Sequence, residues 1–405
     1  MRLDVPRLDD LELAGKRVLV RVDFNCPQDE SGAITDDTRI RAAVPTIDEI
    51  VKKGGKPVLM SHLGRPDGKV VENLRLAVVG KRLEELAKRK VLCLKESIGP
   101  TVEKGIADAA RDAIVLLENV RFHKGETKGD VELAQAYAKN GDVFVNDAFG
   151  TSHRAESSVS VVAQFLPSAA GRLLEREIAA FQRVLDNPAR PLVAVLGGAK
   201  VSDKLPVVAN LIPMCDAILV GGGMAYTFLK ARGEEVGASK LQADQIDAVK
   251  KSMADAEARG CKILLPEDHV VAERFAEDAK PSEVTKIPAG SMGLDIGART
   301  RSRYAREIAA AKTAVWNGPM GVFEWESFRA GTAAVAKAFA ECKGYTVVGG
   351  GDSVAAVELL GVADRIRHIS TGGGASLELL GGETLPGIAS LQHPARPAAA
   401  PRKKP

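Results

Sequence analysis

The sequence predicts an α/β protein with two mainly parallel sheets, each covered by helices on both faces. Short apolar runs rich in β-branched residues alternate with amphipathic helical patterns along the 405-residue chain, and this alternation is typical of parallel sheets. The runs are too numerous for one ordinary sheet. A long amphipathic stretch at 170–191 separates them into two groups, so we expect two sheets in series.

The individual elements follow from the same alternation. The predicted strands are 17–22, 57–60, 113–117 and 142–145 in the first group, and 191–196, 217–220, 262–265, 313–316 and 346–348 in the second. Helical patterns between the strands include 75–89 and 242–260. The tail at 392–405 is mostly Pro, Ala and basic residues. It can bury little apolar surface, so we predict that it is disordered.

Composition excludes several classes of protein. The formal net charge of +3 is too small to argue for nucleic acid. The five cysteines are scattered and form no C-x-x-C pair, which favours a reducing compartment over a disulfide framework or a zinc site. The polar N-terminus has no signal-sequence core, and no apolar run approaches the ~18 residues of a membrane span. We expect a soluble cytoplasmic protein with neither nucleic acid nor membrane as a partner.

The turns after the first-group strands are rich in basic residues. Ligands of open α/β sheets bind beyond the carboxyl ends of the strands, and three of these turns pair an arginine with a histidine. The pairs are His62 with Arg65 in "SHLGRP", Arg121 with His123 in "ENVRFH", and His153 with Arg154 in "NDAFGTSHR". Arg39, in "DDTRIR", adds a fourth arginine just before the helix-like "PTIDEIVKKGG".

These arginines predict a site for a phosphate or a carboxylate, because a guanidinium offers such anions a planar, bidentate fork. A single arginine would more often be a solvated or ion-paired surface residue, but four at corresponding positions favour a site. Asp23 and Asn25 follow the first strand. They either hydrogen-bond a substrate hydroxyl or serve turn chemistry.

The turns after the second-group strands are rich in glycine instead. They read "GGAKVSDK" (197–204), "GGGMAY" (221–226), "NGPMGVFE" (317–324), "GGGDSV" (349–354) and "TGGGAS" (371–376). Glycine lets the backbone approach a ligand closely, and exposed N–H groups at helix starts attract anions. The chain has neither a G-x-G-x-x-G nor a G-x-x-x-x-G-K-[ST] motif. Several glycine turns at one edge still suggest a nucleotide, although a single one could be a helix cap.

Two lysines and one aspartate stand out within these turns. If a helix begins near Ser202, Lys200 and Lys204 lie close to its positive end, an arrangement that makes sense when an anion binds between them. Asp352 either holds Mg²⁺ bridging nucleotide phosphates or is a plain N-terminal helix charge. Ser353 either caps the helix or touches phosphate.

Two other classes of function remain open on the residues alone. "GDSVA" resembles a nucleophile elbow, with Ser353 as nucleophile and His368 downstream, which would indicate a hydrolase. A non-enzymatic nucleotide-binding scaffold would explain the glycine turns. A hydrolase would not explain the arginines of the first-group turns or the two lysines. A scaffold would not explain the basic residues of the first half.

Taken in order, the motifs resemble the signature segments of phosphoglycerate kinase. The segments are "RVDFNCP", "DDTRIRAAVPTI", "SHLGRP", "LLENVRF", "NDAFGTSHR", "LGGAKVSDK", "GGGMAYTFLK", "WNGPMGVFE", "GGGDSVAA" and "STGGGASLELL". They span about residues 17–388, and this ordered set is far more specific than any one motif.

The resemblance implies a fold of two doubly wound, mainly parallel-sheet lobes joined by a hinge helix. The implied parts are an N-terminal lobe at 1–169, a hinge helix and linker at 170–190, a C-terminal lobe at 191–384, and a segment at about 385–391 that packs back near the first lobe. The first lobe would bind 3-phosphoglycerate and the second Mg-ATP or Mg-ADP, and the protein would be a monomer.

The resemblance also assigns roles to individual residues. The substrate-binding set would be Asp23, Asn25, Arg39, His62, Arg65, Arg121 and Arg154. The nucleotide-binding set would be Lys200, Lys204, Gly223, Gly293, Asn317, Glu324, Gly350, Gly351, Asp352 and Ser353, with Asp352 holding Mg²⁺. The catalytic residues would be Arg39, Lys200 and Gly351.

The implied reaction is a reversible, in-line phosphoryl transfer between 1,3-bisphosphoglycerate with ADP and 3-phosphoglycerate with ATP, accompanied by domain closure. The acceptor carboxylate is already ionised near pH 7, so catalysis is positioning and charge stabilisation. The sequence departs from the family pattern at Glu156, where many members have His or a neutral polar residue. A carboxylate there lowers the local positive charge and is expected to weaken anion affinity.

Overall fold

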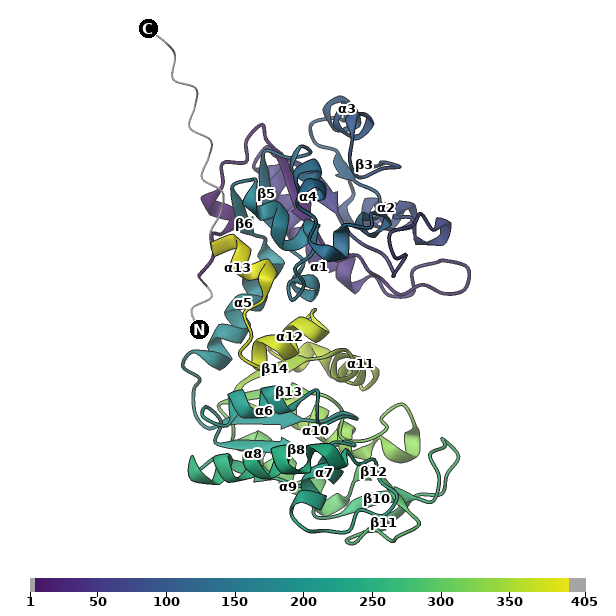
Figure 1. Cartoon of the computed structure of the whole chain (residues 1–405), viewed down its shortest axis with the longest axis vertical. Coiled ribbons are helices and arrows are strands. Elements are labelled where there is room, and N and C mark those ends of the chain that lie inside the picture. The colour runs from purple at the N-terminus through teal and green to yellow at the C-terminus, as the bar shows by residue number, and fades with distance from the viewer. Residues whose placement is uncertain (1–3, 393–405) are drawn as a thin grey trace. The chain divides into compact units, whose positions relative to one another are not determined.

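The computed structural model describes residues 4–392 and divides them into two compact units. We call 4–179 with 384–392 the N-terminal unit, and 180–383 the C-terminal unit. Each unit contains a six-stranded parallel sheet, and Figure 1 shows helices packed around each sheet. The predicted fold class is therefore confirmed. Among the described residues, no helix has the length and apolar character needed to cross a bilayer.

The N-terminal unit has the strand order β3-β4-β2-β1-β5-β6. The strands are β1 (Arg17–Arg21), β2 (Lys56–Met60), β3 (Val91–Cys93), β4 (Ile114–Leu116), β5 (Val143–Asn146) and β6 (Ser168–Ala170). The helices are α1 (Thr38–Lys52), α2 (Ala77–Ala87), α3 (Pro100–Asp108) and α4 (Val131–Ala138). The four strands predicted from apolar runs are adjacent in the sheet, because they bury side chains on both faces.

The C-terminal unit has the strand order β15-β14-β13-β7-β8-β9. The strands are β7 (Leu192–Leu196), β8 (Ala217–Val220), β9 (Lys262–Leu264), β13 (Thr313–Asn317), β14 (Tyr345–Gly349) and β15 (His368–Ile369). The helices are α6 (Leu205–Leu211), α7 (Ala225–Ala231), α8 (Ile246–Ala258), α9 (Ala298–Ala310), α10 (Ala330–Glu341), α11 (Gly351–Leu359) and α12 (Gly373–Leu380). All five predicted second-group strands lie in this sheet.

A second, antiparallel sheet in the C-terminal unit was not predicted. Its order is β11-β10-β12, with β10 at His269–Ala272, β11 at Ser282–Val284 and β12 at Met292–Ile296. The edge strand β11 is short and mostly exposed, so it carries no apolar pattern that sequence reasoning could recognise. The edge strands β3, β6 and β15 were also missed, because segments of two or three residues are too short to show a period.

Two further helices involve residues from the predicted linker and the C-terminal segment. α5 (Arg172–Leu185) runs from the N-terminal unit into the C-terminal unit, since the boundary falls between Ala179 and Ala180. α13 (Pro386–Gln392) packs on β6 and on the π-helical turn η6 (Ser157–Val161) (Figure 1). Its Gly387 N–H donates to the Ser152 carbonyl at 2.8 Å. Of the predicted tail 392–405, Gln392 ends α13, and 393–405 lie outside the described residues.

Two predicted helix starts are wrong by several residues. α1 begins at Thr38, so Pro45 lies inside the helix and Arg39 lies in its first turn. Ile40, Ile47 and Ile50 of this helix are fully buried, and this burial outweighs the hydrogen bond that proline removes. α6 begins at Leu205 and not near Ser202, because the preceding residues form a turn in which the Lys204 N–H donates to the Val201 carbonyl.

Asp147 ties the loop after β5 to the start of α5. Its Oδ1 accepts hydrogen bonds from the Leu173 N–H at 2.9 Å and the Leu174 N–H at 3.3 Å. We expect Asp147→Ala to lower the free energy of unfolding by about 1–2 kcal/mol, as loss of a helix cap does. Asp147→Asn keeps an acceptor oxygen and should lose less. Urea denaturation of the three proteins checks this, and an alanine variant as stable as the wild type would contradict it.

Candidate active site

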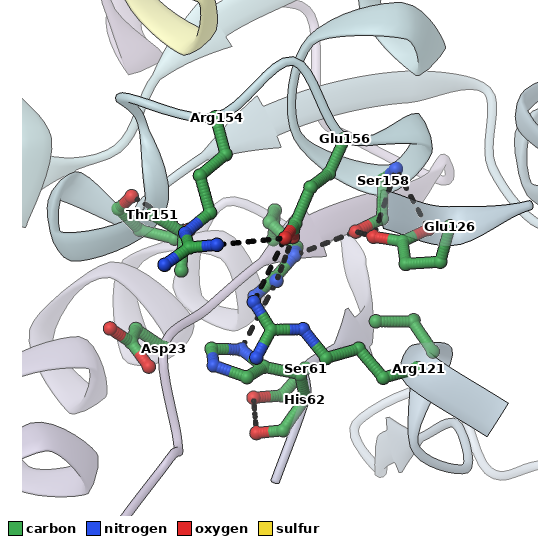
Figure 2. Close-up of polar contacts among 12 residues, drawn as sticks. Asp23, Ser61, His62, Arg121, Glu126, Thr151, Arg154, Glu156 and Ser158 are labelled. Carbon is green, nitrogen blue, oxygen red and sulfur yellow. Dashed lines mark hydrogen bonds and ion pairs between the residues drawn. The ribbon is translucent and has the colours of Figure 1, made fainter. Parts of the chain in front are cut away.

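The N-terminal unit brings the predicted substrate residues to one edge of its sheet. β4, β2, β1 and β5 are neighbours, all parallel, so the loops that follow them emerge at the same edge. These loops carry Asp23 and Asn25, His62 and Arg65, Arg121, and Arg154. Figure 2 shows Asp23, His62, Arg121 and Arg154 gathered around this edge.

Arg39 reaches the same edge from the first turn of α1. Its Nη1 donates to both carboxylate oxygens of Asp23 at 3.1 Å and to the Asn25 carbonyl at 3.2 Å. The Asn25 side-chain oxygen accepts from the Gly64 N–H at 2.8 Å. Burial acts to raise the pKa of Asp23, but the charges of Arg39 and Arg21 outweigh it and hold that pKa below its usual range. Asp23 is therefore an anion that orients Arg39.

His62 is neutral in this setting. Its side chain is almost fully buried, and burial lowers its pKa well below the usual value, helped by nearby Arg21 and Arg121 although Asp23 opposes the shift. The His62 Nδ1 lies 3.3 Å from Arg21 Nη2. A guanidinium can only donate, so Nδ1 is the acceptor and Nε2 carries the proton. His62, which the sequence analysis placed in the substrate site, can therefore donate a hydrogen bond from Nε2.

Sequence reasoning missed Arg21, the residue at the centre of this edge. Arg21 ends β1 and is fully buried, and its Nε donates to the Ser158 hydroxyl at 2.8 Å. A charged residue inside an otherwise apolar run was the available signal. We use the name guanidinium cluster for Arg21, Arg121 and Arg154, because Glu156 pairs with all three.

A cavity of about 550 Å³ opens beside the guanidinium cluster. Its lining includes Arg65, Arg121, Arg154, His123, Lys124 and Lys128, together with one acidic residue, Asp67. The two lysines were not selected from the sequence, and their only signal is their closeness to His123 in the chain. The concentration of fixed cations makes this cavity suitable for a multiply charged anion.

In the C-terminal unit, the glycine turns also meet at one edge. β15, β14, β13 and β7 are adjacent and parallel, and a cavity of about 460 Å³ lies where the turns after them converge. Its lining includes Lys200, Lys204, Asn317, Gly350, Gly351, Asp352 and Ser353. A side chain at Gly197 would lie 2.1 Å from the Pro319 carbonyl, so the turns after β7 and β13 can pack together only with glycine there.

The two lysines of this cavity differ in environment. Lys200 is exposed, whereas Lys204 is largely buried and its Nζ donates to the Asn317 side-chain oxygen. Burial lowers the pKa of Lys204 to about 8, against the opposing charges of Asp203 and Asp352. Ser353 is fully buried, and its Oγ accepts from the Gly318 N–H at 2.6 Å, so this hydroxyl braces the turn after β13.

A second cavity of about 490 Å³ lies beside the first and is mostly apolar. Its lining includes Gly223, Gly293, Glu324, Tyr226, Met292 and Val322. A side chain at Gly293 would lie 1.9 Å from the Tyr226 hydroxyl, so glycine is required for this wall. Asp352 lines both cavities, whereas Asn317 lines only the one with the lysines.

The cavities of the two units differ in chemical character. One unit offers a cavity of fixed cations for an anionic substrate. The other offers lysines and backbone turns for phosphates beside an apolar cavity that suits a base.

Comparisons with known proteins identify the family of this chain. A family model described as phosphoglycerate kinase matches residues 8–383. A phosphoglycerate kinase of Moorella thermoacetica is 53% identical over 386 residues, covering 95% of this chain and 98% of that protein. One of Microcystis aeruginosa is 50% identical over 396 residues, covering 96% and 98%. The solved phosphoglycerate kinase of Coxiella burnetii has a TM-score of 0.86 at 40% identity, covering 96% and 99%.

The chain belongs to the phosphoglycerate kinase family. It is a phosphotransferase that moves a phosphoryl group between 1,3-bisphosphoglycerate with ADP and 3-phosphoglycerate with ATP. The hydrolase and scaffold alternatives are therefore wrong. The hydroxyl of Ser353, the nucleophile that a hydrolase would need, is buried and engaged by the Gly318 N–H.

If Lys204 contacts the nucleotide phosphates, as the family resemblance implies, its low pKa predicts a pH dependence of nucleotide binding. Because the protonated lysine attracts phosphate, ADP affinity should weaken about tenfold as Lys204 loses its proton between pH 7 and 9.5, given its pKa of about 8. Isothermal titration calorimetry across this range checks the expectation. Lys204→Gln is the control, since it should bind weakly at every pH. Parallel pH profiles for the two proteins would contradict the assignment.

Proposed function

We propose that the N-terminal unit binds 3-phosphoglycerate at its cationic edge and that the C-terminal unit binds the nucleotide at its two cavities. The observation that carries the proposal is the contrast between the two edges. The first is lined by arginines and lysines, whereas the second joins a lysine- and glycine-lined cavity to an apolar one.

For the substrate, the proposal assigns the phosphate to the cavity lined by Arg65, Arg121 and Arg154, where bidentate guanidiniums suit it. The glycerate end lies toward Asp23 and Asn25, and His62 offers its Nε2 proton as a donor. Arg39, held by Asp23 at 3.1 Å, faces the phosphoryl group that is transferred. This arrangement would place the acceptor carboxylate next to a fixed positive charge.

For the nucleotide, the proposal assigns the phosphates to Lys200, Lys204, Gly350 and Gly351. Gly223, Gly293 and Glu324 line the cavity that would take the adenosine. The residues also fit Mg²⁺. Asp352 is exposed and lines both cavities, and among residues 4–392 there is no cluster of three or more potential metal-ligating side chains. One carboxylate suffices, because Mg²⁺ keeps water and phosphate ligands and would neutralise phosphate charge.

The proposed mechanism needs no protein nucleophile and no general base. The substrate carboxylate is ionised near pH 7 and attacks the γ-phosphorus in line, while the bond to the ADP leaving oxygen breaks. Arg39 and Lys200 stabilise charge on the transferred group, and the Gly351 N–H is a further donor. Domain closure during turnover would bring these groups together and exclude water, which suppresses ATP hydrolysis.

We further propose that the protein works as a cytoplasmic monomer on small molecules. Its described cysteines are all free thiols, as expected in a reducing compartment. The large apolar side chains that are exposed among residues 4–392 come from different elements: Val70, Val131, Leu241, Phe275 and Leu359. Light scattering coupled to size-exclusion chromatography tests the monomer. A dimer mass at micromolar concentration would overturn it.

The assignment of Arg39 predicts a specific kinetic defect. Arg39→Ala should lower kcat by about 10²–10³, the loss seen on removing one transition-state donor, in a coupled assay of 3-phosphoglycerate-dependent ATP consumption. Arg41→Ala is the matched control, because Arg41 lies on the same helix but pairs with Asp37 at the surface. A variant in which Arg39→Ala raises only KM would show that Arg39 does not act on the transferred group.

A further inference from the structure

Glu156 is a carboxylate buried among the arginines that are proposed to bind substrate. Its side chain is 2% exposed. Its Oε1 accepts a hydrogen bond from Arg121 Nη2 at 2.8 Å and lies 4.0 Å from Arg154 Nη1. Its Oε2 lies 3.8 Å from Arg21 Nη2. Figure 2 shows the Glu156 carboxylate between the side chains of Arg121 and Arg154. The Glu156 carboxylate therefore lies within ion-pair distance of all three arginines of the guanidinium cluster.

The cluster needs an anion even without substrate. Arg21 is fully buried and Arg121 nearly so, and a buried guanidinium without a counter-charge is strongly destabilising because it cannot give up its proton. Two other acids lie near the cluster. Asp23 interacts with Arg21, but its ion pair is with Arg39. Glu126 is linked to Arg21 through the Ser158 hydroxyl. Burial raises the pKa of Glu126 to about 7 although Arg21 opposes the shift, so Glu126 carries only part of a charge at neutral pH. Glu156 is the carboxylate that forms ion pairs with all three arginines of the cluster.

The hydrogen bonding of Glu156 indicates that its charge matters more than its shape. Oε2 is buried, yet within residues 4–392 it has no hydrogen-bond partner. The Nε of Arg121 is likewise buried without one. A buried polar group that serves only to hold a fold is normally fully hydrogen-bonded. Glu156 Oε2 and Arg121 Nε instead have no hydrogen-bond partner among the residues described. Arg121 Nε can therefore still donate a hydrogen bond to a bound anion.

We propose that Glu156 is a built-in counter-ion, which stabilises the guanidinium cluster when substrate is absent and limits how tightly the cluster binds an anion. Arg121 and Arg154 each face both Glu156 and the cavity. A substrate phosphate bound there shares these cations with a fixed negative charge, so its affinity is lower and its release faster than the arginines alone would give. Glu156 is thus a positioning residue that sets substrate affinity. This inference rests on the proposed binding of 3-phosphoglycerate at the cluster.

Glu156→Gln tests the counter-ion directly. The amide is nearly isosteric and can still accept from Arg121, but the charge is lost. The free variant should have a lower Tm than the wild type, and inorganic sulfate should raise its Tm more than it raises that of the wild type. The KM for 3-phosphoglycerate should fall about three- to tenfold, while the KM for ATP stays unchanged.

Glu118→Gln is the matched control. Glu118 is also a buried carboxylate of the N-terminal unit, paired with Arg75 at 2.9 Å, and it has no ion pair with the guanidinium cluster in the described chain. It should lose stability without any change in the response to sulfate. If Glu156→Gln behaves like this control, with a lower Tm but the sulfate response and KM of the wild type, Glu156 is only structural and the proposal is wrong.

Two further measurements keep the test decisive. If Glu156→Gln is unfolded in dilute buffer, recovery of its circular dichroism in sulfate supports the counter-ion, and no recovery overturns it. Arg154→Ala tests whether 3-phosphoglycerate binds at the guanidinium cluster, independently of the role of Glu156. An unchanged KM for 3-phosphoglycerate in Arg154→Ala would show that the substrate binds elsewhere, and the sulfate response of Glu156→Gln would then decide the counter-ion by itself.

Discussion

The parallel register of the central strands is the constraint on which both sites depend. Arg21 of β1 aligns with Met60 of β2 and with Asn146 of β5, so the loops after these strands leave the sheet at one level. In the other sheet, Asn317 of β13 aligns with Leu196 and Gly349 in the same way. Segments distant in the chain therefore meet without any loop having to reach across the fold.

Cations that lie close together repel one another, and the two units offset this repulsion in different ways. Arginine stays charged when buried, whereas lysine can lose its proton. The arginines of the N-terminal unit are accordingly matched with carboxylates, Arg39 with Asp23 and Arg121 with Glu156. Lys204 of the C-terminal unit has the neutral Asn317 as its partner, and burial lowers its pKa to about 8. If the two units bind anions as proposed, internal charge would set the affinity in one unit and protonation would set it in the other.

The glycine turns have a steric reason beyond ligand approach. Gly197 and Gly318 belong to turns whose backbones press against each other, and Gly293 leaves room for the Tyr226 hydroxyl. A side chain at any of these positions would collide with backbone or a buried ring. The cavities of the C-terminal unit are therefore shaped by the packing between turns as much as by the residues that line them.

The sequence by itself determined the class of fold, the central strands of both sheets and the residues at their carboxyl ends. These depend on apolar runs, helical periodicity and turn composition, which are local properties of the chain. Only the tertiary structure decided the edge strands β3 and β6, the antiparallel sheet of β10 to β12, the start of α6, and the pairing of Arg21 and Arg121 with Glu156. These strands are three to five residues long, which is too short to show a clear period. Charge compensation and protonation depend on which groups burial brings together, and that is a property of the folded molecule alone.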